Sequence, residues 1–247
     1  MPQITETIAY LDDWLTPDAF DDLGPNGLQV PAARDVERVV TGVTAQRALF
    51  DAAVARDAQL VLVHHGLFWR FNPLGLTPLL AERLRPLFKH DIALAAYHLP
   101  LDAHPEIGNN ALLAAALGAS QHDAFAGIGR GATFAEPVPA GELFARVESA
   151  TGREPLVFDA GPPEIRRIAI VSGGAASRLD QAVAEGYDAF LTGEPKENVM
   201  ADAREAGIHF IAAGHYATET FGVRRLGDLL AERFGIEHIW VDLPNPV

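Results

Sequence analysis

Apolar runs of strand length alternate with amphipathic stretches of helix length along most of the chain. This alternation is typical of βα units that build a mostly parallel sheet, so it predicts an α/β fold. The predicted strands cover residues 39–43, 60–63, 92–97, 168–171, 189–192, 210–213 and 238–243. The predicted helices cover residues 4–15, 45–56, 78–89, 109–117, 177–185, 196–205 and 218–234.

The two halves of this pattern repeat one another. Each half runs strand, helix, strand, helix, strand, then a histidine and a further helix. Both third strands are followed by a histidine with a carboxylate four residues later: His98 with Asp102, and His215 with Glu219. We interpret the repeat as an internal duplication.

The duplication predicts two similar βα lobes with mostly parallel sheets, 1–128 and 129–247, and a metal site in the cleft between them. The alternative is one intertwined domain without independent folding units. The second lobe begins with segment 129–159, which is rich in Gly and Pro and holds two short β-like runs around one helix. We interpret this segment as a link.

Composition narrows the class of protein. The chain has 247 residues, 49% of them hydrophobic, which suffices for a substantial buried core. The formal charge of -14 disfavours nucleic acid and anionic membranes as partners, because binding to phosphate backbones needs Lys and Arg. There is no membrane-length apolar stretch and no signal-peptide pattern at the start, so we expect a cytoplasmic protein.

Cysteine is absent, which excludes disulfides, thiolate metal sites and Cys nucleophiles. Any metal must therefore bind His and carboxylate side chains. Functional groups in α/β sheets gather beyond the carboxyl ends of the strands. His64 and His65 end one buried strand, and the two His-carboxylate pairs follow two others.

Each of these groups has a structural explanation when taken alone, such as a hydrogen-bonded core histidine or an acid at a helix start. Their coincidence at three strand ends favours a metal centre. The six candidate ligands are His64, His65, His98, Asp102, His215 and Glu219. Six ligands exceed what one tetrahedral ion takes and suit two divalent ions, and nitrogen with oxygen donors does not distinguish Zn, Fe, Mn or Ni.

Two further features are candidates for chemistry. Glu194 follows a strand in the second half and could face the same cleft as a general base, or could be a solvated loop acid. The turn 172–174 could present backbone N–H groups to a phosphate, although two glycines at a βα turn are more often plain turn residues.

Several segments together resemble the dinuclear-metal-centre hexameric protein family, whose members are commonly described as type 2 homologs of GTP cyclohydrolase I. They are 26–30, 63–69 (VHHGLFW), 98–102, 108–110, 192–194 and 214–219 (GHYATE). The resemblance covers the whole chain, in the short form that lacks an inserted domain. It implies a toroidal homohexamer with two divalent ions per subunit, bound by residues matching His64, His65, Asp102, His215 and Glu219, with His98 lining the site.

Two functional classes follow. The first is a dinuclear metal-dependent hydrolase, GTP cyclohydrolase-like, that uses metal-bound water on a nucleotide or another small cyclic C–N substrate. The family label implies opening of the guanine imidazole ring with loss of formate. The alternative is a metal-binding or regulatory scaffold without catalysis, in which the ions are structural or cargo.

Overall fold

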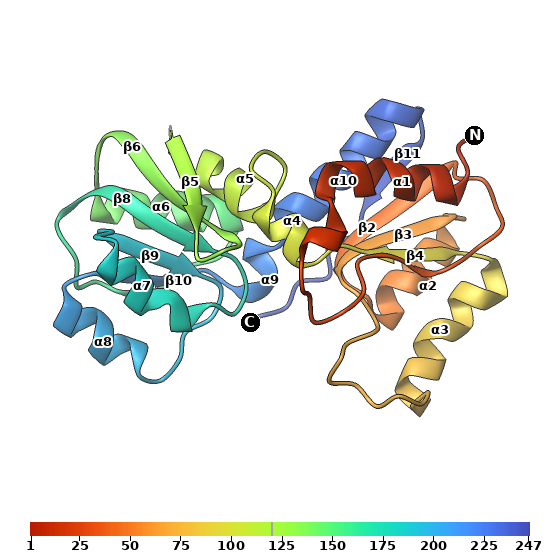
Figure 1. Cartoon of the computed structure of the whole chain (residues 1–247), viewed down its shortest axis with the longest axis horizontal. Helices are drawn as coiled ribbons and strands as arrows, with labels where there is room; N and C mark the ends of the chain where they lie inside the picture. Colours follow the sequence, from red (N-terminus) through yellow and green to blue (C-terminus); the bar gives the residue numbers. More distant parts are fainter. Residues whose placement is uncertain (120) are drawn as a thin grey trace. The chain divides into compact units, whose positions relative to one another are not determined.

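Two compact units make up the chain, and each is a sheet with helices on both faces (Figure 1). The computed structural model describes every residue except 120, and only the backbone of 121 and 122. Unit 1 consists of Met1–Leu101 with Gly222–Leu243, and unit 2 of Asp102–Phe221 with Pro244–Val247. The predicted α/β class is confirmed.

Unit 1 contains a five-stranded sheet in the order β1-β4-β3-β2-β11 among its described residues. Strands β2, β3, β4 and β11 run parallel, and β1 pairs antiparallel with β4 at one edge. The strands are β1 (Gly27–Val30), β2 (Arg38–Thr44), β3 (Leu60–His65), β4 (Ala93–Ala96) and β11 (Glu237–Trp240). The helices are α1 (Ile4–Leu15), α2 (Arg47–Ala55) and α3 (Pro78–His90), together with most of α10 (Thr220–Phe234).

The centre of this sheet is apolar on both faces because helices cover both. Val61 and Val63 of β3 pack with Leu49 of α2 and Leu87 of α3. Helices α1 and α10 cover the opposite face of the sheet (Figure 1). Side chains alternate along a strand, so the buried Leu62, between Val61 and Val63, lies on that opposite face. A strand buried on both faces is a continuous apolar run, which explains why β3 was predictable as a core strand.

Unit 2 contains a six-stranded sheet in the order β5-β6-β8-β9-β10-β7 among its described residues. Strands β8, β9 and β10 run parallel, whereas β5, β6 and β7 pair antiparallel with their neighbours. The strands are β5 (Gln121–Phe125), β6 (Gly129–Pro139), β7 (Leu156–Phe158), β8 (Glu164–Val171), β9 (Ala189–Thr192) and β10 (His209–Ala212). The helices are α5 (Asn109–Ala116), α6 (Ala140–Thr151), α7 (Leu179–Ala184), α8 (Val199–Ala206) and α9 (His215–Thr218).

Alternate residues of the central strands of unit 2 serve two cores. Ile170 of β8 packs on the side of α5 and α6. Val171, the next residue, packs on the side of α7 and α8 together with Phe190 and Phe210. Apolar cores therefore cover both faces of this sheet, and we expect functional side chains at the ends of its strands.

The predicted internal repeat is present in the strand order. In chain order, β1 to β4 of unit 1 pair as 1-4-3-2, and β7 to β10 of unit 2 pair as 7-10-9-8. Both sets have three adjacent parallel strands with an antiparallel strand beside the last. The repeats differ at the opposite edge, where unit 1 has β11 and unit 2 has the β5-β6 hairpin.

The segment 129–159 is not the link that we predicted. Residues Gly129–Pro139 form the long strand β6, which pairs with β5 and β8, and β7 closes the far edge against β10. The pairing of β6 is irregular between Thr133 and Val138, where the side chains of 135–137 are partly or fully exposed. This irregularity breaks the alternation that would have indicated a strand.

The packing units also differ from the contiguous lobes 1–128 and 129–247. The chain passes between units at 101/102, inside the short helix α4 (Leu99–Ala103), again at 221/222 inside α10, and a third time at 243/244. Whether the predicted lobes fold independently stays a prediction. No helix in the described part of the chain combines the length and apolar character that a membrane span requires.

Candidate metal centre

Three histidines meet at the carboxyl end of the unit 1 sheet. His64 and His65 end β3, and His98 follows β4, the parallel neighbour of β3. One ring nitrogen of each lies within 4.8 Å of the other two. His64 is fully buried, while His65 and His98 are half-buried. The structure thus brings together the three histidines that the sequence predicted from two separate strands.

The protein fixes the orientation of these rings through their Nδ1 atoms. His64 Nδ1 donates to the backbone carbonyl of Tyr97 at 2.9 Å, and a neutral imidazole that donates there carries its lone pair on Nε2. His98 Nδ1 lies 2.7 Å from Asp22 Oδ1, and His65 Nδ1 lies 3.3 Å from Thr44 Oγ1. Metal-binding histidines characteristically use their second nitrogen in this way.

Asp22 is a functional residue that sequence reasoning missed. It is buried, and its carboxylate also accepts hydrogen bonds from Asn26 at 2.9 Å and from the Leu99 N–H at 2.9 Å. Burial alone raises the pKa of Asp22. Hydrogen bonds from His98, Asn26 and the Leu99 N–H, together with the charge of His98, outweigh burial and hold the pKa at about 2. Asp22 is therefore a carboxylate anchor for His98. The only sequence signal was the Pro-Asn-Gly turn that follows it.

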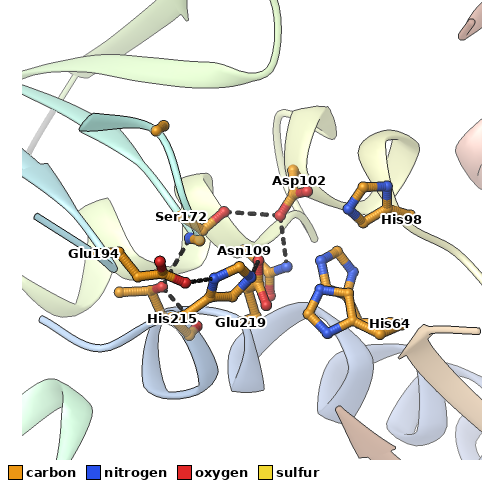
Figure 2. A network of polar contacts seen from close by, with 12 residues as sticks. His64, His98, Asp102, Asn109, Ser172, Glu194, His215 and Glu219 are labelled. Atoms are coloured by element: carbon orange, nitrogen blue, oxygen red, sulfur yellow. Dashed lines mark hydrogen bonds and ion pairs between the residues drawn. The ribbon is translucent and has the colours of Figure 1, made fainter. Parts of the chain in front are cut away.

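Unit 2 presents an acid–histidine cluster after its own third parallel strand. His215 begins α9 directly after β10, and its Nε2 lies 3.2 Å from Glu219 Oε1, four residues on. The short helical turn brings the two side chains to the same side, as the spacing predicted. Glu219 is buried, and one of its oxygens lies within 4.8 Å of a carboxylate oxygen of Asp102 (Figure 2).

Glu194 lies on the other nitrogen of His215. Its Oε1 forms a short contact with His215 Nδ1, so the imidazole lies between two carboxylates (Figure 2). Burial lowers the pKa of His215, but the hydrogen bonds and charges of Glu219 and Glu194 outweigh it and raise the pKa to about 9. The contact shows Glu194 as an orienting partner of His215, the counterpart of Asp22 on His98. The general-base role predicted for Glu194 stays a prediction.

Asp102 is held by residues from two other elements of unit 2. Its Oδ1 accepts hydrogen bonds from Asn109 Nδ2 and Ser172 Oγ, both at 2.8 Å (Figure 2). Asn110 donates from its side chain to the Asp102 carbonyl at 3.2 Å and accepts from the Ser172 N–H at 2.7 Å. Asp102 is thus an ordered, buried carboxylate. Asn109 and Ser172 were not predicted in this role.

The turn 172–174 lies against Glu219, and its contact with a phosphate stays a prediction. Gly173 has φ +67°, and a Cβ at this position would collide with Glu219 Oε1. Its N–H donates to Thr218 Oγ1 at 3.0 Å, so this donor is already used within the protein. The glycine is required because the backbone passes directly against the Glu219 carboxylate.

Arg130 places a buried guanidinium next to the Asp102 segment. Its side chain donates to the carbonyl of Ala103, and its Nε has no hydrogen-bond partner among the described residues. Only 7% of the residue is exposed, and burial lowers the pKa of the guanidinium. No carboxylate pairs with this guanidinium in the part of the chain that the structure describes, and an unpaired buried cation is costly, so stability alone does not account for Arg130.

The donor chemistry of the two clusters fits divalent transition metals. Unit 1 offers three oriented imidazoles, and unit 2 offers one imidazole with two buried carboxylates. Nitrogen and oxygen donors of this kind suit Zn, Fe, Mn and Ni. All six predicted ligands therefore lie in one or other of two donor clusters, and Glu194 lies in the second.

Comparison with known proteins identifies close relatives over the whole length. Residues 2–246 match the Duf34/NIF3 (NGG1p interacting factor 3) family. A Pseudomonas aeruginosa protein named GTP cyclohydrolase 1 type 2 homolog is 50% identical, and the alignment covers 98% of each chain. The solved structure of protein ybgI, described as of unknown function, is 42% identical with a TM-score of 0.95 over 99% of this chain and 100% of that one. The protein TTHA1606 from Thermus thermophilus is 37% identical with a TM-score of 0.93 over the same shares.

Proposed function

The chain belongs to the Duf34/NIF3 (NGG1p interacting factor 3) family, and from this premise we propose that it is a dinuclear metal-dependent hydrolase. Its substrate would be a nucleotide or another small cyclic C–N compound. Relatives named GTP cyclohydrolase 1 type 2 homolog support this substrate class and make GTP the first compound to test.

One observation carries the metal-binding part of the proposal. Three imidazoles converge within 4.8 Å, and the protein occupies each Nδ1 with a carbonyl, a hydroxyl or a carboxylate. A core histidine that served packing alone would need one such partner, but would not need ring nitrogens of two further histidines within 4.8 Å. The arrangement therefore supports a cation that the three imidazoles share.

We further propose that His215, Glu219 and Asp102 complete the ligand set for two ions. His98 and Asp102 are joined by the single turn of α4, so the chain itself links the donors of unit 1 to those of unit 2. Carboxylate oxygens supply the hard donors that an all-histidine cluster lacks, and they are suited to bridging two ions.

When bound, divalent ions of this kind polarise a substrate and lower the pKa of water. The chain's own residues supply orientation and charge. Asp22 and Glu194 hold the rings of His98 and His215, while Asn109 and Ser172 hold the Asp102 carboxylate. If Glu194 acts as a general base, it would have to do so from its position on His215.

Metal analysis tests the first part of the proposal. We expect about two transition-metal ions per chain after purification without chelator, and fewer in His64→Ala and His215→Ala. Arg34→Ala, which removes an exposed pair with Asp57, is the control and should keep full metal content. Absence of bound metal after reconstitution with Zn, Mn, Fe or Ni would refute the proposal.

Turnover tests the second part. We expect slow formate release from GTP, or hydrolysis of another nucleotide or cyclic amide, at a rate that follows metal occupancy. Full occupancy with no turnover across such a panel would instead support the metal-binding scaffold.

Self-association is a separate proposal that rests on family resemblance. We expect a homohexamer, which light scattering should detect as a mass near six times 26.5 kDa. A mass of one chain at all concentrations would contradict it.

A further inference from the structure

A cavity of about 310 Å³ lies in unit 1, within the segment that follows the His64-His65 pair. Its walls come from Pro25, residues 67–70, residues 72–76 and Leu80, and most of them are apolar. We propose that this cavity binds a planar heteroaromatic ring, such as the base of a nucleoside, against the indole of Trp69. This inference deepens the proposed function by naming the substrate class, and it rests on that function only for the role of the histidines.

Trp69 connects the cavity to the histidines. Its ring lies edge-on to the ring of His98, with centroids 5.1 Å apart at 86°, and 6.1 Å from the ring of His65. Trp69, Phe68 and Pro25 also line a small hollow that reaches His64 and His98. A ring bound against Trp69 would therefore be held next to the candidate metal ligands.

Phe71 extends the aromatic surface. Its ring is parallel to that of Trp69 within 9°, with centroids 5.8 Å apart, although 71% of Phe71 is exposed to solvent. Leu74 and Leu76, which line the cavity itself, are exposed as well. Apolar side chains gathered around a hollow at the surface are typical of a binding site, because solvent exposure of such a patch is unfavourable.

The segment is shaped before any ligand arrives. The Arg70 N–H donates to the Leu23 carbonyl at 2.7 Å, and the Asn72 N–H donates to the Trp69 carbonyl at 2.9 Å. The Asn72 side chain donates to the Leu67 carbonyl at 3.3 Å. Such anchors lower the entropic cost of binding, because little of the loop must become ordered.

The charges around the cavity favour an uncharged ring over a phosphate. Arg70 is the one cationic residue in the described lining, and Asp21 neutralises it across 2.7 Å. The volume falls within the range of small-molecule sites, which combine apolar walls with a few polar groups. Stacking on an aromatic side chain tolerates any base. We therefore expect the cavity to bind planar rings without preference for one pattern of hydrogen-bonding groups.

Equilibrium dialysis of the full chain with radiolabelled guanosine, uridine and 5,6-dihydrouridine tests the inference. We expect guanosine and uridine to bind and dihydrouridine, whose base is not planar, to bind at least 10-fold more weakly. Trp69→Leu should weaken guanosine binding about 10-fold or more, and Trp69→Phe should restore most of it. Phe71→Ala should weaken binding about 3-fold, whereas Phe88→Ala, which removes an exposed phenylalanine from α3, should leave it unchanged.

The measurements are made on metal-stripped and metal-loaded protein, so that a failure of the hydrolase proposal does not affect them. Circular dichroism must show that each variant is folded. Equal binding of uridine and dihydrouridine would overturn the inference, as would equal binding by Trp69→Leu and Phe88→Ala. If Phe71→Ala and Trp69→Leu lower the oligomer mass while guanosine binding is unchanged, the surface belongs to a second copy of the chain.

Discussion

Asp22 Oδ1 lies 2.7 Å from His98 Nδ1, although the two residues are 76 positions apart in the sequence. In unit 2, Glu194 occupies the same kind of position on His215. Both repeats of the fold thus present, after their third parallel strand, a histidine whose Nδ1 is held by a carboxylate. The shared arrangement supports a common role for the two histidines, and the two carboxylates can be tested separately.

Replacing Asp22 by Asn should weaken metal binding about 10- to 100-fold, because the ring of His98 loses the carboxylate that orients it. Asp21→Asn is the matched control, since Asp21 is its exposed neighbour and pairs with Arg70. Chelator competition at fixed pH measures both affinities. Equal affinities for the two variants would show that Asp22 has no role in metal binding.

Glu194→Gln distinguishes two roles for this acid. We expect metal affinity to fall about 10-fold, because the amide holds His215 Nδ1 less strongly than the carboxylate does. Metal content and turnover are measured on the same preparation. A variant that keeps its metal content but loses turnover would support the general-base role that the sequence predicted.

Gly173→Ala should lower both stability and metal content. The positive φ of this residue costs about 1–2 kcal/mol for alanine, and the new Cβ displaces the Glu219 carboxylate. Gly207→Ala is the control, because Gly207 has φ +68° with no atom within 4 Å of the new Cβ. Urea unfolding should give similar losses from φ in both variants, and metal analysis should give a loss only for Gly173→Ala.

Arg130→Met tests whether the buried guanidinium serves stability. We expect the free energy of unfolding to change by no more than about 1 kcal/mol, because an apolar side chain of similar length removes a buried charge. Metal affinity should fall, since the Ala103 carbonyl beside Asp102 loses its donor. A large loss of stability with unchanged metal affinity would assign Arg130 a purely structural role.

The central strands and the placement of the six candidate ligands at strand ends were predictable because both depend on local signals. An apolar run that ends in His64-His65 indicates a buried strand with chemistry at its end, and β9 (Ala189–Thr192) has the predicted bounds. The anchors Asp22, Asn109 and Ser172 were not predictable. Their roles depend on hydrogen bonds between distant segments, and an acid in a loop has no periodicity that would identify its partner.

The strand pairing at the edges of the sheets was hidden for a similar reason. Apolar alternation indicates that a segment is a strand, but it contains no information on which strand lies beside it. The predicted strand 238–243 exists as β11, yet it joins β2 of unit 1, about 200 residues earlier in the chain. A division into two contiguous lobes places β11 and its partner β2 in different lobes.

The return of β11 to the first sheet has a consequence for biosynthesis. During translation the strand β2 emerges early, but its outer edge stays open until residues 237–240 leave the ribosome. The helix α10, which covers one face of the same sheet, also arrives late. The sheet of unit 1 is therefore completed only about 200 residues after β2 is synthesised, and nascent chains that stall before this point would expose an unpaired strand edge that is prone to aggregation.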